Sequence, residues 1–168
     1  MFGDPISFEV RSRLTAHRGK LLSGADRGVP VHAAAFIRQR MIVLETDLFS
    51  RPEQLCLIVV HEIFHFVWVR LGNSQRHAFV RLLTNEMQSR ARGEMGESSD
   101  VKKQLLPKWA FFDSSSRLWR DYACESFCDS GAAFFSGVTT NEHFTLAGRW
   151  AKRRYAWLLC MGEEGWRC

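Results

Sequence analysis

The chain has 168 residues, 46% of them hydrophobic and 24% charged, which fits one globular domain over residues 1–168 and excludes a disordered protein. Lys and Arg exceed Asp and Glu by 23 to 18, and this net charge of +5 is too small to select nucleic acid, membrane or an acidic protein as partner. The five cysteines are odd in number and lack C-x-x-C spacing, which argues against a disulfide scaffold and favours a cytoplasmic location.

The N-terminal third predicts one helix followed by a β-hairpin. Its start lacks the basic and apolar segments of a signal peptide. Residues 6–22 place apolar side chains at helical spacing between arginines, which indicates an amphipathic helix ending near Gly24. Residues 31–37 and 41–44 are apolar runs separated by the polar residues 38–40, which predicts two paired strands. Together with the helices that follow, we expect an α+β fold that is mainly helical, with a small sheet packed against the central helix.

The clearest helix signal begins at Ser50. Ser50 and Glu53 match a capping box, and Pro52 is tolerated in the first turn. Apolar residues then occur nearly all round the helix as far as Leu71, so we expect it to be central and buried. Polar residues interrupt its apolar stretch, residues 55–69, which is therefore predicted to be too short and too polar to span a bilayer, and we expect a soluble protein.

The C-terminal half predicts further helices separated by polar breaks. Residues 74–92 carry an apolar stripe, and residues 93–100 are typical of a loop. The remaining predicted features are a short helical piece to Leu106, a polar break at 113–116, a helix over 117–135 capped by Ser116 or a neighbour, and a last helix from a capping box at 139–142 to about 160. The basic residues of this last helix are expected mostly to face water: Arg149, Lys152, Arg153 and Arg154.

His61 and His65 lie four residues apart, in the sequence H-E-I-F-H. On a helix, side chains at this spacing share one face, so the two imidazoles can bind one metal ion. The carboxylate of Glu62 lies beside them, where it can accept a proton from metal-bound water. The alternative is two core histidines that bond backbone carbonyls, and it accounts less well for Glu62. A catalytic zinc site has three protein ligands, so a third must come from another element.

Glu125 is the candidate for that third ligand. It lies on the helix predicted over 117–135, with Asp129 one turn later on the same face. The neighbouring residues are small or apolar, so both carboxylates need partners, and a metal with its histidine would supply them. Asp129 would accept the free N–H of a ligating histidine. The alternative for Glu125 is an exposed carboxylate paired with an arginine. Cys124 and Cys128 are interpreted as small buried hydrophobes rather than as metal or redox groups.

The combination of H-E-x-x-H with a separate E-x-x-x-D helix resembles the gluzincin branch of the zincin metallopeptidases. Within that branch, the short hairpin before the motif helix and the segment 125–135 resemble the compact ImmA/IrrE-type metallopeptidases. The resemblance spans roughly residues 31–135. The chain departs from the compact type in two ways: the segment between His65 and Glu125 is long, and Cys128-Asp129 stands where Ala-Asn is usual.

The resemblance implies a minimal zincin fold and zinc-dependent hydrolysis of peptide bonds in a peptide or protein substrate. It implies that zinc is bound by His61, His65 and Glu125, and that Glu62 takes a proton from the metal-activated water and returns it to the leaving amine. The donor that stabilises the transition-state oxyanion stays open. Its candidates are Tyr155, His143, Arg149 and Tyr122.

Two other functions stay open. One is a zincin-like domain that binds zinc and serves in interaction or regulation without peptidase activity. The other is a basic helical nucleic-acid-binding module in which the motif is accidental. We do not expect nucleic acid as a partner, because the aromatic residues fit a protein core better than a platform for stacked bases, and we expect no membrane partner.

Overall fold

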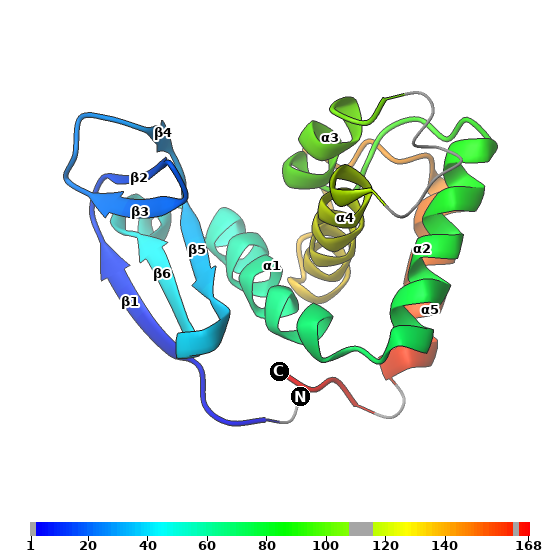
Figure 1. Ribbon diagram of the computed structural model, residues 1–168, viewed down its shortest axis with the longest axis horizontal. Helices are drawn as coiled ribbons and strands as arrows, with labels where there is room; N and C mark the ends of the chain where they lie inside the picture. The colour runs from blue at the N-terminus through cyan, green and yellow to red at the C-terminus, as the bar shows by residue number, and fades with distance from the viewer. Residues whose placement is uncertain (1–2, 108–115, 163–164) are drawn as a thin grey trace.

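The computed structural model describes residues 3–107, 116–162 and 165–168. Its N-terminal part consists of small sheets and its C-terminal part of helices, with the long helix α1 between them (Figure 1). The α+β class is therefore confirmed. The strands are β1 Ser7–Arg11, β2 Leu14–His17, β3 Lys20–Ser23, β4 Val29–Pro30, β5 Ala33–Phe36 and β6 Met41–Glu45. The helices are α1 Pro52–Arg70, α2 Asn73–Gln88, α3 Glu97–Gln104, α4 Arg117–Phe135 and α5 Gly148–Gly162, with short 3-10 turns η1 Ile37–Gln39 and η2 Thr46–Ser50.

The sheet that faces α1 has the strand order β1-β6-β5. Strands β5 and β6 are antiparallel, with Ala33 opposite Leu44 and Ala35 opposite Ile42, so the predicted hairpin is confirmed. The β6 side chains from Ile42 to Glu45 are buried, and β1 pairs in parallel with the other side of β6. Strand β5 therefore lies at an edge of its sheet, and it is the strand that packs against α1.

The helix predicted over residues 6–22 is wrong, because this segment forms strands β1, β2 and β3. In β1, apolar and polar residues alternate with the period of two that a strand requires. Strands β2 and β3 form a hairpin whose turn, Arg18-Gly19, has positive φ angles of 48° and 74°. A turn with positive φ at both central residues matches the twist of paired strands, and glycine adopts it without steric strain.

The N-cap of helix α1 lies one residue after the position predicted for it. Its N-cap is Arg51, which makes no side-chain capping bond, so the predicted capping box is wrong. The Ser50 hydroxyl instead donates to the carbonyl oxygen of Asp47, because residues 46–50 form the turn η2. Pro52 is the first helical residue and so lies in the first turn, as expected.

Helix α1 lies between β5 and α4, which pack on different sides of it. Gly131 of α4 allows the close approach of the two helices, because a Cβ atom there would lie 2.2 Å from the ring of Phe64. Among the described residues, α1 is also the one helix that is long and apolar enough to cross a membrane by length and composition. The expectation that this stretch is too short and too polar for that was therefore wrong. The expectation that the helix is buried all round was also wrong, because its buried residues are Glu62, Phe64, Phe66 and Val67.

The helix predicted over 117–135 is confirmed as α4, which has the same bounds. The Ser116 hydroxyl caps it by accepting the backbone N–H of Trp119. The predicted helix over 74–92 is present as α2, which ends at Gln88. The expected loop at 93–100 is partly wrong, because α3 begins at Glu97. Most of the predicted polar break at 113–116 lies outside the described residues.

Helix α5 begins at Gly148, so the predicted capping box at 139–142 does not start a helix. The side chain of Asn141 accepts the backbone N–H of His143 and stabilises a turn at this position. Turns such as this one and the first residues of helices favour the same residue types, because both need a side-chain acceptor for a free backbone N–H.

Arg154 is fully buried, at 0% exposure, and the expectation that it faces water is wrong. Its guanidinium pairs with Glu86 of α2 at 2.6 Å and with Glu94, which precedes α3, at 2.8 Å. Glu94 also accepts the Tyr122 hydroxyl at 2.6 Å and pairs with Lys103 at 2.9 Å. This group of five residues, the buried ion network, connects α2, α3, α4 and α5.

Candidate metal centre

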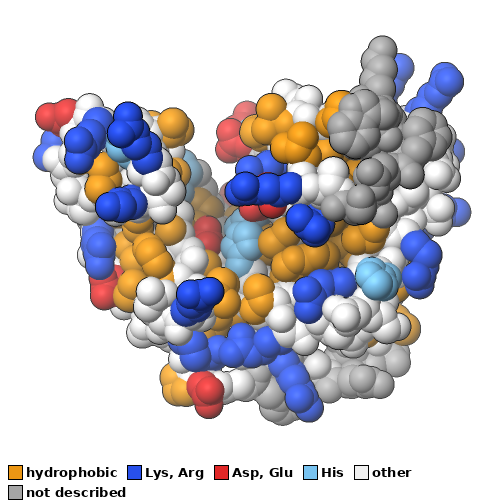
Figure 2. All heavy atoms as spheres, in the orientation of Figure 1, with side chains coloured by type: hydrophobic (Ala, Val, Ile, Leu, Met, Phe, Trp, Pro, Cys, Tyr) orange, Lys and Arg blue, Asp and Glu red, His pale blue; other side chains and the backbone are white. Residues whose placement is uncertain are grey.

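A cleft runs along α1 between the sheet part and the helical part of the molecule, and histidine surface is visible inside it (Figure 2). Two cavities of about 310 Å³ and 910 Å³ make up the cleft. They adjoin each other, because both are lined by Ala33, His61, Glu62 and Ser98. The H-E-x-x-H motif therefore lies where the two cavities meet.

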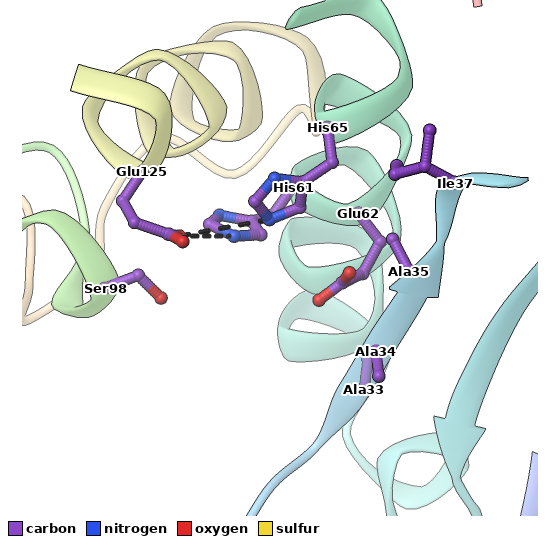
Figure 3. A pocket seen from close by; sticks show the side chains of 9 residues that line it. All are labelled: Ala33, Ala34, Ala35, Ile37, His61, Glu62, His65, Ser98 and Glu125. Carbon is purple, nitrogen blue, oxygen red and sulfur yellow. Dashed lines mark ion pairs between the residues drawn. The ribbon is translucent and has the colours of Figure 1, made fainter. Parts of the chain in front are cut away.

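The two histidines of α1 face the carboxylate of Glu125 on α4 (Figure 3). One carboxylate oxygen of Glu125 lies 3.3 Å from Nε2 of His61 and 3.9 Å from Nε2 of His65. With metal–nitrogen and metal–oxygen bonds of about 2.0–2.1 Å, neighbouring ligand atoms of a tetrahedral zinc site lie roughly 3.3 Å apart. The first distance matches this spacing and the second is longer, so Glu125 lies where it could share a metal ion with both histidines.

Glu62 follows His61 on α1 and reaches into the space between α1 and β5 (Figure 3). Its side chain is buried, and it lines both cavities. Figure 3 shows its carboxylate across the cavity from Ser98, with the two histidines between Glu62 and Glu125. A carboxylate in this place can exchange a proton with a water molecule held beside the histidines.

Asp129 binds the other ring nitrogen of His61. One of its oxygens lies 2.7 Å from Nδ1 of His61, and the other accepts the backbone N–H of Ser99 at 2.7 Å. Gly96 leaves room for this carboxyl group, because a Cβ atom there would lie 2.3 Å from its Cγ. A proton held on Nδ1 by Asp129 leaves Nε2 free to bind a metal, which is the role expected for Asp129.

The surroundings of His61 favour positive charge. Burial lowers the pKa of His61, but hydrogen bonds with Asp129 and Glu125 and the nearby charge of Glu62 outweigh burial and raise the pKa well above its usual value. For Glu125, burial raises the pKa, and the two histidines lower it further than burial raises it. Such a group of carboxylates around a buried imidazole provides the negative charge that a cation would neutralise.

His65 has sulfur partners instead of a carboxylate at its other ring nitrogen. Its Nδ1 lies 3.5 Å from Sγ of Cys124 and 3.4 Å from Sγ of Cys128. A hydrogen bond with Cys128, which outweighs burial, and the contact with His65 lower the pKa of Cys124 to about 6. The two cysteines are therefore part of the site, and interpreting them as simple apolar packing was incomplete.

His61, His65 and Cys128 form a group that could hold a metal ion, since each offers a ligand atom within 4.8 Å of the others. Two arrangements of ligands are thus available in the same place, one with Glu125 and one with Cys128. The Nε2 atoms of both histidines approach Glu125, whereas the sulfur of Cys128 approaches Nδ1 of His65. Of the two, the set with Cys128 is the group of described residues whose ligand atoms all lie within 4.8 Å of one another.

The residues predicted as oxyanion donors lie in different places. His143 lines the larger cavity, and its Nε2 lies 3.7 Å from Glu142 and 3.8 Å from Glu97. Tyr155 is not among the lining residues of either cavity, and its ring packs against Phe134.

The other two candidates are engaged elsewhere. The Tyr122 hydroxyl donates to Glu94 in the buried ion network. The guanidinium of Arg149 stacks over the ring of Trp150 at 4.9 Å. Of the four candidates, His143 is therefore the one whose side chain belongs to the cleft.

The segment before and at the start of α3 adds residues that sequence reasoning missed. Ser98 lines both cavities, the backbone of Ser99 binds Asp129, and Gly96 makes room for that carboxylate. The signal was the run Gly-Glu-Ser-Ser-Asp, because small polar and acidic residues are typical of the first turn of a helix.

Comparisons with known proteins assign no family to this chain. No family model matches it, and no curated protein and no solved structure gives a significant match. Conclusions about its function therefore depend on its own residues and their geometry.

Proposed function

We propose that this protein is a zinc-dependent metallopeptidase of the gluzincin type. The observation that carries the proposal is the approach of His61 Nε2 and His65 Nε2 to a single oxygen of Glu125, with Glu62 on the same cavity wall. Asp129 supports the proposal because it holds Nδ1 of His61. In this proposal His61, His65 and Glu125 are the metal ligands.

Zinc is the metal that this set of donors suits best. Two imidazoles and one carboxylate are the protein ligands of many catalytic zinc sites, which keep a fourth position open. When bound, zinc would lower the pKa of a water molecule toward neutrality and polarise the carbonyl group of a substrate.

Glu62 is the general base in the proposed reaction. Its carboxylate takes a proton from the attacking water as the water oxygen bonds to the carbonyl carbon of the peptide. The carbon–nitrogen bond then breaks, and Glu62 returns the proton to the leaving nitrogen. His143 is the proposed donor to the oxyanion, because its side chain lines the larger cavity.

The strand β5 supports a peptide as the substrate. It lies at an edge of its sheet, and Ala33, Ala34 and Ala35 line the smaller cavity beside Glu62. An extended peptide can pair with the free backbone groups of such an edge. The small alanine side chains leave space between this edge and the histidines, so a paired peptide would pass in front of Glu62.

Replacing Glu62 tests the proposal, with Glu9→Gln on the exposed strand β1 as a matched control. We expect wild-type protein and both variants to retain one zinc ion per chain. With a fluorescently labelled unfolded protein as substrate, the Glu62→Gln variant should lose about 10²–10⁴-fold in kcat. Glu9→Gln should cleave as fast as wild type.

Equal cleavage by the Glu62→Gln variant and wild type would contradict the assigned base. A wild-type protein that binds zinc but cleaves nothing in a broad panel of unfolded substrates would support the other interpretation of this site. In that case the chain is a zinc-binding domain that acts through interaction or regulation.

A further inference from the structure

The two histidines of the motif differ in what binds the nitrogen turned away from Glu125. Nδ1 of His61 has the carboxylate of Asp129 at 2.7 Å. Nδ1 of His65 has two sulfur atoms, those of Cys124 and Cys128, at 3.5 Å and 3.4 Å. Helix α4 therefore supplies the partner of Nδ1 for both histidines.

The position of the two cysteines follows from the spacing on α4. Cys124 precedes Glu125, and Cys128 lies one turn later and precedes Asp129. One helix thus brings Glu125 to both Nε2 atoms, Asp129 to one Nδ1 and both sulfurs to the other Nδ1. The side chain of Cys128 is fully buried, at 0% exposure, so water does not compete for this contact.

A sulfur acceptor suits this position better than a fourth buried carboxylate beside the ligands. Glu62, Glu125 and Asp129 already place three acidic groups around the histidines. A further buried anion would cost free energy that one divalent ion does not offset. A thiol sulfur accepts a hydrogen bond only weakly, but two sulfurs lie within reach of the same N–H.

We propose that Cys124 and Cys128 are positioning residues of the metal centre, whose sulfurs accept the Nδ1–H of His65 and keep its Nε2 turned toward the metal. An imidazole with its proton fixed on Nδ1 presents the lone pair of Nε2, as a metal ligand must. The inference rests on the proposed metal site, and it assigns to the two cysteines the role that Asp129 has for His61.

Substitutions that separate hydrogen bonding from packing test this role. The Cys124→Val/Cys128→Val variant fills a similar volume without an acceptor, and the Cys124→Ser/Cys128→Ser variant keeps an acceptor in a smaller side chain. We expect the zinc dissociation constant, measured by competition with a coloured chelator, to rise about 10–100-fold in the valine variant. It should stay nearer to wild type in the serine variant. The exposed pair Cys56→Val/Cys160→Val is the control and should bind zinc as wild type does.

The reverse order, with weak binding in the serine variant and wild-type binding in the valine variant, would show that the cysteines act by packing and would overturn the inference. Unchanged zinc binding in both double variants would overturn it as well. If the valine double variant fails to fold, the single substitution Cys124→Val at the partly exposed position carries the same expectation.

The absorption spectrum of the cobalt(II) form distinguishes positioning from direct ligation. We expect wild-type protein to lack an intense near-ultraviolet band of thiolate-to-cobalt charge transfer. Such a band, lost on Cys128→Ser substitution, would make Cys128 a ligand and overturn the inference. Both readouts are independent of catalysis, so a protein that binds zinc without cleaving peptides contradicts the proposed peptidase function alone. A protein that binds neither metal contradicts both.

Discussion

Asp129 shows how much of the candidate centre depends on one residue that does not itself face the metal position. Its two oxygens bind different elements, since one contacts His61 of α1 and the other accepts the backbone N–H of Ser99 in α3. Each contact is 2.7 Å long, and Gly96 provides the space. Asp129 therefore fixes both the tautomer of His61 and the position of the helix that carries Ser98 at the cavity.

Substitution Asp129→Asn should weaken zinc binding about 10–100-fold, the usual effect of losing a partner of a ligating histidine. The reason is that both contacts need an acceptor, whereas an amide offers one acceptor and one donor. Competition with a chelator measures the change. Asp121→Asn, near the start of the same helix and paired with Arg117, is the control. Equal zinc affinity of the Asp129→Asn variant and wild type would contradict this role.

Spacing in the sequence predicts which residues can meet at this site, but it does not predict how the histidine rings are oriented. The separations of His61 and His65, and of Glu125 and Asp129, each place two side chains on one helix face. The proximity of Glu125 to both histidines agrees with that prediction. The sulfur contacts of His65 depend on which way its ring turns, and spacing along a helix carries no information about that.

At the scale of elements, the contact between α1 and α4 brings the two halves of the site together. It is close because Gly131 faces the ring of Phe64, which is fully buried. The ring of Phe64 also packs against Phe127 at a centroid distance of 5.3 Å. Phe127 lies between Glu125 and Asp129 in the sequence, so this packing sets the height of both carboxylates along α1.

Substitution Gly131→Ala should lower the free energy of unfolding by about 1–3 kcal/mol, because the added methyl group forces α4 and the Phe64 ring apart. The intrinsic preference of alanine for helices acts in the opposite direction and is smaller, at about 1 kcal/mol. Urea unfolding measures the difference. Gly148→Ala at the start of α5 is the control, since a Cβ atom there meets nothing within 4 Å. A Gly131→Ala variant as stable as wild type would show that the helices are not in close contact.

The elements were predictable where local signals agree with tertiary contacts. Helix α4 has a serine cap and a regular apolar pattern, and its bounds match the prediction. Strand β1 was missed because its pairing partner β6 lies more than thirty residues away, at Met41 opposite Ser7. The start of α5 was misplaced because Asn141 caps a turn, and a turn cap and a helix cap look alike in sequence.

At the scale of the whole molecule, the buried ion network joins the four helices α2, α3, α4 and α5. Arg154 pairs with Glu86 and Glu94, and both carboxylates are also buried. Sequence alone gave no sign of this network, because its members are spread over residues 86–154 and its four charged members each resemble a surface charge. Buried charges that compensate one another in this way make stability depend on pH.

The pKa of Glu94 predicts the direction of that dependence. Burial raises this pKa, but Arg154, Lys103 and Tyr122 outweigh burial and lower it from 4.5 to about 2. A carboxyl group whose pKa is lower in the folded state contributes stability that is complete above its unfolded pKa and is lost as pH falls toward its folded pKa. For Glu94 this contribution is about 3 kcal/mol, lost between about pH 4.5 and pH 2. The pKa of Glu86 is raised above its usual value, and burial is the largest cause of this shift. Glu86 therefore acts in the opposite direction and offsets part of the loss.

Comparing zinc-free wild type with the Glu94→Gln variant removes the contribution of groups outside the network; within it, loss of the Glu94 charge also lowers the pKa of Glu86. We expect the variant to be less stable by a constant amount above about pH 5, and the difference to shrink as pH falls below about 4.5. Urea unfolding at a series of pH values measures it. A difference in stability that stays constant down to pH 3 would contradict the lowered pKa of Glu94.

The most direct test of the proposed site is a crystal structure of the zinc-loaded protein, with data collected on both sides of the zinc absorption edge. The proposal predicts one anomalous peak, bonded to Nε2 of His61, Nε2 of His65 and the carboxylate of Glu125, with Glu62 beside it. A peak bonded to the sulfur of Cys128 in place of Glu125, or no peak between these side chains, would contradict it.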